Sequence, residues 1–245
     1  EEAVLVSARA DDDRIAAAAW TWLLYSLGFQ NRLDEAFTLE LAARAAVERA
    51  HDEVAQGWLL NNLGVLHGMR GDPERAREQL RRALEVKQRA LGSEHIDVGI
   101  SWFNLGLTLA DGRSHDEALD AFERARSIFD ATVGEQHPLA HYAIFGLCRV
   151  EHARGRPQAA VSLCREALAH FEASPLAQYW QSLAAYHLAQ ALWGTGAEPE
   201  ALDAGRRARS LSIDPELTRE IDHWLSDPSS HHQRLRAIKD HPPRR

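Results

Sequence analysis

The sequence contains little cysteine and no long apolar run. No stretch of about 18 apolar residues occurs, which excludes a transmembrane helix, and residues 1–20 lack the basic flank and apolar core of a signal peptide. The two cysteines, Cys148 and Cys164, are too few for a disulfide framework. We therefore expect a soluble, cytoplasmic protein in which both cysteines are buried thiols.

Helix-breaking and strand-favouring residues are also sparse. Alanine and leucine dominate, β-branched residues are few, and only 9 prolines and 15 glycines interrupt the 245 residues. This composition predicts an all-α protein. The 28 basic and 36 acidic residues give a net charge of −8, which argues against a molecule whose whole surface binds nucleic acid.

What the sequence does contain is an internal repeat. The segment that ends at His95 and the segment that ends at His137 agree at six positions, each pair 42 residues apart, and further copies lie on both sides at spacings of 40 to 42. A period of this length indicates stacked helical repeats. The repeated positions are Leu63, Leu105, Leu147 and Leu188; Gly64 and Gly106; Ala36, Ala76, Ala118, Ala160 and Ala201; Ala43, Ala83, Ala125, Ala167 and Ala208; Gly92 and Gly134; His95 and His137.

The small residues of the repeat have a packing role. Ala76 and Ala83 are seven residues apart and so share one face of the second helix of a unit, while Gly64 leaves a matching gap on the first helix. Small side chains at a crossing let two helix axes approach closely. The Gly-Asp-Pro turn at residues 71–73 should end the first helix with glycine and begin the second with an aspartate cap and a proline, and the turn at residues 155–157 should do the same.

This unit resembles the tetratricopeptide repeat (TPR), with a leucine before the small residue of the first helix and two alanines in the second. The longer form, with LNNLG opening the unit and RALGSEHIDVG linking it to the next, is similar to the repeats of kinesin light chain and of many bacterial signalling proteins. Eight extra residues, if helical, lengthen each unit by roughly 12 Å. The resemblance implies a right-handed superhelical TPR solenoid of about five helix pairs plus a C-terminal capping helix.

The repeat also sets the expected domain organisation. Residues 1–10 should form the second helix of a truncated repeat, so we expect the chain to begin inside a unit. Residues 213–227 should form the capping helix, because apolar residues recur every four positions from Leu217 to Leu225, and residues 228–245 should form a basic, flexible tail. The five units between these ends are expected at about 11–51, 52–94, 95–136, 137–173 and 174–212.

In proteins of this family the first helices line the concave surface, where peptides bind. The resemblance therefore implies a concave groove for a protein or peptide ligand, in which aromatic rings supply apolar area and amides pair with a peptide backbone. Asn62 and Asn104 match the position of a ligand-contacting amide, and the alternative is that they hydrogen-bond between neighbouring repeats. The expected groove residues are Trp22, Tyr25, Asn61, Asn62, Val65, Phe103, Asn104, Leu107, Tyr142, Phe145, Arg149, Tyr186, His187, Gln190 and Trp193.

Catalytic and metal-binding motifs are missing from the sequence. It has no GxSxG, no phosphate-binding loop and no kinase motif, and its 13 histidines include no HExxH. We therefore expect no enzyme activity in this chain, no cofactor and no metal. The other tryptophans of the first helices, Trp20, Trp58 and Trp102, are expected to pack in the core.

These features predict a non-catalytic protein–protein interaction module. The long alanine- and arginine-rich repeats resemble the C-terminal TPR region of bacterial serine/threonine protein kinases, which implies a regulatory or scaffolding role in a larger, ATP-dependent signalling protein. The alternative is a ligand-sensing TPR domain of a transcription regulator or protease. Nucleic-acid binding through the tail is the least favoured reading, no membrane partner is expected, and self-association through the truncated N-terminal repeat stays open.

Overall fold

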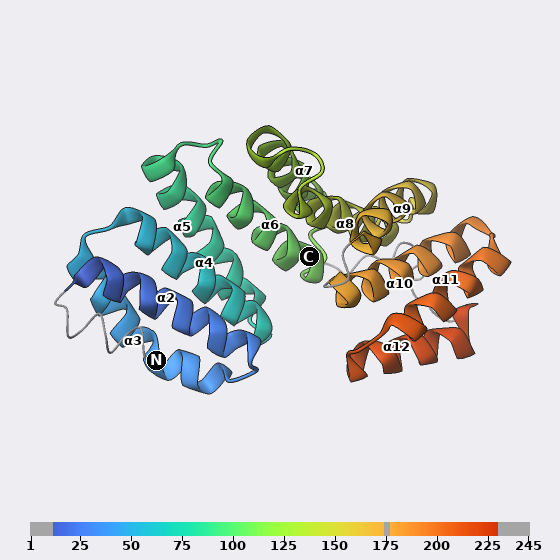
Figure 1. Cartoon of the computed structure of the whole chain (residues 1–245), viewed down its shortest axis with the longest axis horizontal. Coiled ribbons are helices and arrows are strands. Elements are labelled where there is room, and N and C mark those ends of the chain that lie inside the picture. The colour runs from blue at the N-terminus through green and yellow to red at the C-terminus, as the bar shows by residue number, and fades with distance from the viewer. Residues whose placement is uncertain (1–11, 174–176, 230–245) are drawn as a thin grey trace, which may run out of the picture. The chain divides into compact units, whose positions relative to one another are not determined.

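The computed structural model describes residues 12–173 and 177–229, and this part of the chain is helical with no strand (Figure 1). Two predicted segments, residues 1–10 and most of the basic tail, lie outside the described residues. The helices are α2 (Asp13–Phe29), α3 (Leu33–Ala50), α4 (Glu53–Met69), α5 (Pro73–Leu91), α6 (Ile96–Asp111), α7 (His115–Val133), α8 (Pro138–Ala153), α9 (Pro157–Glu172), α10 (Gln178–Thr195), α11 (Glu198–Leu211) and α12 (Pro215–Ser226).

The helices pack in consecutive pairs, which confirms the predicted all-α repeat architecture. We call α2, α4, α6, α8 and α10 the A helices and α3, α5, α7, α9 and α11 the B helices. The chain divides after Ser114 into two compact units, so each is described by itself. In unit 1, α2 packs on α3 and α4 on α5, and α4 contacts both α2 and α6. In unit 2, α8 packs between α7 and α9, α10 packs on α11, and α12 contacts α11.

The repeated alanines lie where the helices of a pair cross. A Cβ atom added to Gly64 of α4 would stand 2.6 Å from Cγ of Leu80 and 3.2 Å from the carbonyl oxygen of Ala76 on α5, so the crossing leaves no room for a side chain. The predicted packing role is confirmed, because all ten repeated alanines are fully buried: Ala36, Ala43, Ala76, Ala83, Ala118, Ala125, Ala160, Ala167, Ala201 and Ala208.

The turn before α5 has the predicted construction. Gly71 takes a positive φ of 81°, which glycine adopts without strain, and the Asp72 carboxylate accepts a hydrogen bond from the backbone N–H of Arg75. Pro73 is the first residue of the helix. The turn before α9 differs from the prediction, because Arg156 stands at the cap position and makes no side-chain cap.

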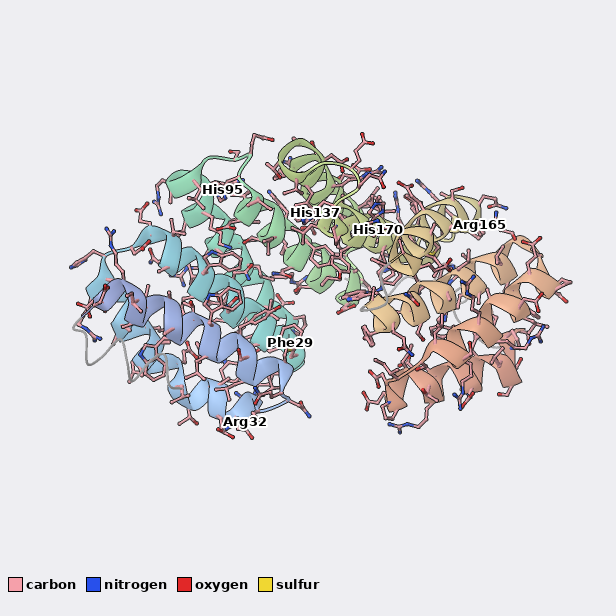
Figure 2. The ribbon with its side chains drawn as sticks, in the orientation of Figure 1. Phe29, Arg32, His95, His137, Arg165 and His170 are labelled. Atoms are coloured by element: carbon pink, nitrogen blue, oxygen red, sulfur yellow. A yellow bond between two sulfur atoms is a disulfide. The ribbon has the colours of Figure 1, made fainter. Side chains whose placement is uncertain are left out.

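Two histidines begin A helices in the same way. The Nδ1 atom of His95 accepts the backbone N–H of Asp97 at 3.1 Å, and that of His137 accepts the N–H of Leu139 at 3.2 Å (Figure 2). Each histidine thus serves as the N-cap of α6 or α8. This shared capping role explains why the repeat has a histidine at both positions.

The two cysteines are joined by a disulfide, so the expectation of buried thiols is wrong in its chemistry although both residues are fully buried. Cys148 of α8 occupies the position equivalent to Gly64, where the A and B helices approach closely, and Cys164 faces it from α9 with a Cα–Cα distance of 5.3 Å. The sequence did not predict this disulfide, because only the crossing of α8 and α9 brings the two cysteines together.

The last described helix, α12, buries one face against its neighbour. Leu217, Ile221 and Trp224 are buried, and a Cβ atom added to Gly205 of α11 would stand 2.6 Å from the Trp224 ring. Leu225 is only half-buried. None of the described helices is long and apolar enough to cross a membrane.

Candidate functional site

A row of aromatic rings lies along α2, and two of its three side chains are exposed. Trp22 is 61 % exposed and Phe29 63 % exposed, with the half-buried Tyr25 between them. The rings touch in sequence, at centroid distances of 5.8 Å for Trp22–Tyr25 and 4.5 Å for Tyr25–Phe29. We call these three residues the aromatic row. Phe29 (Figure 2) was not among the predicted groove residues. It lies seven residues after Trp22 and therefore on the same face of the helix, so the sequence contained the signal.

Equivalent A-helix positions extend this surface across unit 1. Tyr25 of α2, Val65 of α4 and Leu107 of α6 occupy the same place in successive repeats, and all three are half-buried. Since α4 contacts both α2 and α6, these equivalent positions lie on three neighbouring A helices, and we call the three side chains the apolar strip. Phe103 on α6 is also half-buried.

A hydrogen-bond ladder ties the A helices of unit 1 together. Asn62 of α4 donates to the carbonyl oxygen of Thr21 on α2 at 2.9 Å, and the Asn61 side-chain oxygen accepts from Ser101 at 3.0 Å and from Asn104 at 3.1 Å on α6. Asn61 and Asn62 are 1 % and 4 % exposed. Asn62 and Asn104 therefore both make the inter-repeat bonds that were the alternative to ligand contact, and Asn104 is half-buried.

A buried lysine lies beneath Trp58. Lys87 of α5 is fully buried, with its Nζ atom 3.4 Å from the centroid of the Trp58 ring and 3.3 Å from the carbonyl oxygen of Asp97, to which it donates. Trp58 Nε1 donates to the Asp97 carboxylate at 3.0 Å. Burial lowers the pKa of Lys87 to about 7, and the Asp97 charge acts in the opposite direction.

Sequence reasoning missed this lysine, although a signal was present. Lys87 lies four residues after the second repeated alanine of its unit, where other units carry the buried Val47, Phe129 and Phe171. A charged residue at an apolar position of a repeat marks an unusual environment.

The candidate residues of unit 2 belong mostly to its core. Phe145, Tyr186 and Gln190 are buried, and the Tyr186 hydroxyl donates to the carbonyl oxygen of Glu220 on α12 at 3.5 Å. Burial raises the pKa of Tyr186 to about 12. The other predicted groove residues of this unit are half-buried: Tyr142, Arg149, His187 and Trp193.

Rings of unit 2 contact one another rather than forming an exposed row. Tyr142 lies 4.7 Å from Trp180 between ring centroids, and Trp193 meets Trp224 edge-on at 6.2 Å. Trp193 therefore packs against the core, although it was expected to line the groove. Trp20, Trp58 and Trp102 of unit 1 are half-buried, with Trp20 packed against the core of α2, α3 and α4.

Two histidines form a stacked pair in unit 2. The rings of His141 on α8 and His170 on α9 lie nearly parallel with centroids 3.6 Å apart, and both ring nitrogens of His141 are buried. Burial lowers the pKa of His141 to about 4, with the neighbouring His170 and Arg126 acting in the same direction. Among residues 12–173 and 177–229 no group of three or more possible ligands could hold a metal ion.

The sequence matches two family models, both described as tetratricopeptide repeat, at residues 57–97 and 122–177. The first match runs from α4 to the start of α6, and the second from α7 through α9. No curated protein matches the chain.

Solved structures of helical repeat proteins resemble the fold. A kinesin light chain-like TPR repeat protein of Podosopora anserina is 20 % identical and gives a TM-score of 0.65 over 82 % of this chain and 95 % of its own. BtubC (BKLC) from P. vanneervenii is 18 % identical, with a TM-score of 0.66 over 98 % of this chain and 85 % of its own. Aspartyl phosphate phosphatase F from Bacillus subtilis is 15 % identical, with a TM-score of 0.69 over 97 % of this chain and 64 % of its own.

Sequence identities this low show only that the folds are similar, whereas the two family matches identify the repeats themselves. Stacked repeats of this type form protein-interaction scaffolds rather than catalytic sites. The chain therefore carries tetratricopeptide repeats at residues 57–97 and 122–177, and repeats of this kind form protein-interaction modules.

Proposed function

We propose that the A-helix face of unit 1 binds an apolar peptide segment of a partner protein. The observation that carries the proposal is the exposure of Trp22 and Phe29, because large aromatic side chains left in water are typical of binding surfaces. The strip formed by Tyr25, Val65 and Leu107 offers the segment a path across three helices. The Asn104 amide already donates to Asn61, but the side chain is half-buried, and we include it in the proposal as a contact to the peptide backbone.

The size of this face suits a short peptide. Packed helices lie about 8–10 Å apart, so the strip across α2, α4 and α6 is roughly 20 Å long. An extended chain covers that distance with about six residues. Affinity would come mainly from the aromatic row, since tryptophan and other aromatic side chains dominate interface energies.

Selection of peptides from a displayed random library on the purified chain tests this proposal. We expect the selected peptides to be rich in apolar residues and to shift the tryptophan fluorescence. Trp22→Ala and Phe29→Ala should each weaken binding by about 10-fold or more. Leu41→Ala is the matched control, because Leu41 is 78 % exposed on the B helix α3. Equal binding by the three variants and the parent chain would refute the assignment.

The same variants distinguish a peptide partner from a second copy of the chain. If the aromatic row joined two copies, Trp22→Ala would convert a dimer into a monomer in light scattering after size exclusion. We expect the parent chain and Trp22→Ala to have the same mass. A mass change would replace the peptide proposal with self-association.

For the parent protein, we propose a regulatory or scaffolding role in a larger bacterial signalling protein such as a serine/threonine kinase. The long alanine- and arginine-rich repeats support this role. A sensor role is the second candidate, because one structure of similar fold, with a TM-score of 0.65, is a signal transduction ATPase described as having a tetratricopeptide repeat sensor. The reading frame upstream of residue 1 tests both: a kinase domain would support the first, and an ATPase, DNA-binding or protease domain the second.

A further inference from the structure

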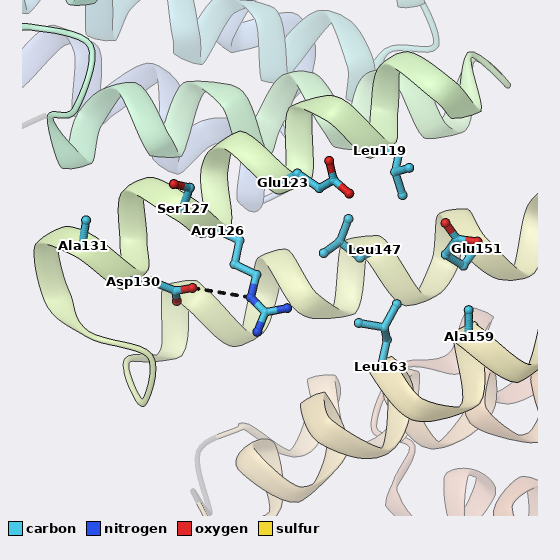
Figure 3. A pocket seen from close by; sticks show the side chains of 10 residues that line it. All are labelled: Leu119, Glu123, Arg126, Ser127, Asp130, Ala131, Leu147, Glu151, Ala159 and Leu163. Atoms are coloured by element: carbon cyan, nitrogen blue, oxygen red, sulfur yellow. Dashed lines mark ion pairs between the residues drawn. The ribbon is translucent and has the colours of Figure 1, made fainter.

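In the part of the chain that the structure describes, one acidic and one basic side chain are buried, and they are held in different ways. Glu151 of unit 2 lines the hollow between α7, α8 and α9 (Figure 3), and ion pairs with Arg154 at 3.0 Å and Arg156 at 3.7 Å hold its carboxylate. The ammonium of Lys87 in unit 1 instead faces the Trp58 ring and donates to a backbone carbonyl oxygen. An ammonium held by uncharged groups is close to losing its proton, so Lys87 can change its charge within the fold.

The space around Lys87 fits a long side chain. A Cβ atom added to Gly57 of α4 would stand 2.5 Å from Cγ of Lys87, so the aliphatic stem of the lysine lies directly on this glycine. In the preceding helix pair the equivalent residues are Ala17 and Val47, both buried. Two apolar side chains therefore suffice for packing at this place in the repeat, and packing does not require the lysine.

Trp58 joins Lys87 to the aromatic row. The ammonium lies 3.4 Å from the centroid of the Trp58 ring, which in turn stacks on Trp22 with centroids 6.4 Å apart and planes at 27°. Trp58 is half-buried, and its Nε1 atom donates to the Asp97 carboxylate at 3.0 Å. One ring thus separates the buried ammonium from the exposed Trp22 of the binding surface.

Two opposing effects set the charge of Lys87. Burial disfavours the ammonium and has the larger effect, whereas the Asp97 carboxylate of α6 favours it, and the pKa falls to about 7. From α4, Gly57 and Trp58 face the lysine, and neither carries a charge. An apolar segment laid on Trp22 and Trp58 removes further water from this region, so it favours the neutral amine over the ammonium.

We propose that the protonation of Lys87 regulates the affinity of the aromatic row for its peptide, with tighter binding when the lysine is neutral. This inference rests on the proposed function, because it concerns the regulation of that same surface. Linkage gives the sign: a segment that lowers the pKa of Lys87 when it binds must bind the deprotonated chain more tightly. Affinity therefore rises with pH between about 6 and 8, and a fall of one pKa unit on binding corresponds to about a 10-fold change in Kd.

The indole N–H signals of the full ¹⁵N-labelled chain test the link between Lys87 and the aromatic row without any peptide. The signals of Trp58 and Trp22, assigned by their loss in Trp58→Phe and Trp22→Phe, should move with a common midpoint near pH 7. Lys87→Met should abolish this step in both signals, whereas Arg82→Met, at an exposed position of the same helix, should keep it. A parent chain without the step, or a step that persists in Lys87→Met, would overturn the proposal.

The peptide acetyl-Ser-Leu-Phe-Ala-Leu-Ser-amide is the probe for the effect on binding, since it has no titrating group of its own. Its Kd, measured by tryptophan fluorescence, should be at least about 3-fold lower at pH 8.5 than at pH 6 for the parent chain and for Arg82→Met. Lys87→Met should bind it with the same Kd at both pH values. Equal Kd values in the parent chain would overturn the regulation and leave the proposed function standing, whereas no binding at either pH would refute both.

Discussion

Replacing the buried lysine of unit 1 by an apolar side chain should stabilise the protein. The pKa of Lys87 falls from 10.5 to about 7, and at about 1.4 kcal/mol per pKa unit this corresponds to roughly 5 kcal/mol against the charged form. The cation–π contact between the Lys87 ammonium and the Trp58 ring offsets about 2 kcal/mol of that cost. Lys87→Met keeps an unbranched chain beside Gly57 and removes the charge, so we expect the free energy of unfolding to rise by about 1–3 kcal/mol at pH 7.

The pH dependence gives an independent check of the same reasoning. Between pH 7 and about 10.4 the unfolded state holds the lysine proton while the folded state has released it, so the stability of the parent chain rises with pH in this window. Below pH 7 both states are charged and this contribution is constant at its lowest value. The advantage of Lys87→Met should therefore be largest at or below pH 7 and shrink as the pH approaches 10.

Urea unfolding followed by circular dichroism at pH 6, 7, 8.5 and 9.5 measures both effects. Arg82→Met is the control on the same helix, because Arg82 is exposed, and its effect should stay within about 0.5 kcal/mol. A Lys87→Met chain less stable than the parent at pH 7 would refute the estimated cost of burial. A difference that is the same at pH 7 and pH 9.5 would refute the lowered pKa.

Three further predictions concern unit 2, and the last of them has a comparison variant in unit 1. Because the pKa of His141 is about 4 in the folded chain and about 6.5 when unfolded, stability should fall by about 1–3 kcal/mol from pH 6.5 to 4, and His141→Phe should flatten that slope in urea unfolding. Thiol titration in denaturant should find no free thiol before reduction and two afterwards, and reduction should cost up to about 3 kcal/mol for a 16-residue separation; two thiols at the outset would contradict the disulfide. Gly146→Ala should destabilise by about 1–2 kcal/mol, because the new Cβ would lie 2.5 Å from the buried Phe122 ring, whereas Gly68→Ala, with its nearest neighbour at 3.9 Å, should stabilise by about 0.5–1 kcal/mol; a gain at position 146 would show that the ring yields.

Much of the fold could be predicted because its causes are local or periodic. The repeated alanines, the glycine at position 64 and the Asp72 cap act through helix geometry and recur at a fixed spacing, so their roles are readable without coordinates. The same reasoning could not predict which residues line the groove. Repeat register places Asn62 on an A helix, but whether its amide meets a ligand or the carbonyl of Thr21 depends on the neighbouring helix.

The sequence by itself determined that this protein is a stack of helix pairs, since period, small residues and caps each favour the same units. Only the tertiary structure decided how individual polar side chains are used: the disulfide between Cys148 and Cys164, the site of Lys87 against Trp58, and the unpaired oxygen of Glu151. The physical reason is that a helix period fixes which face a residue occupies, whereas desolvation and hydrogen bonding depend on the atoms that another helix brings to that face.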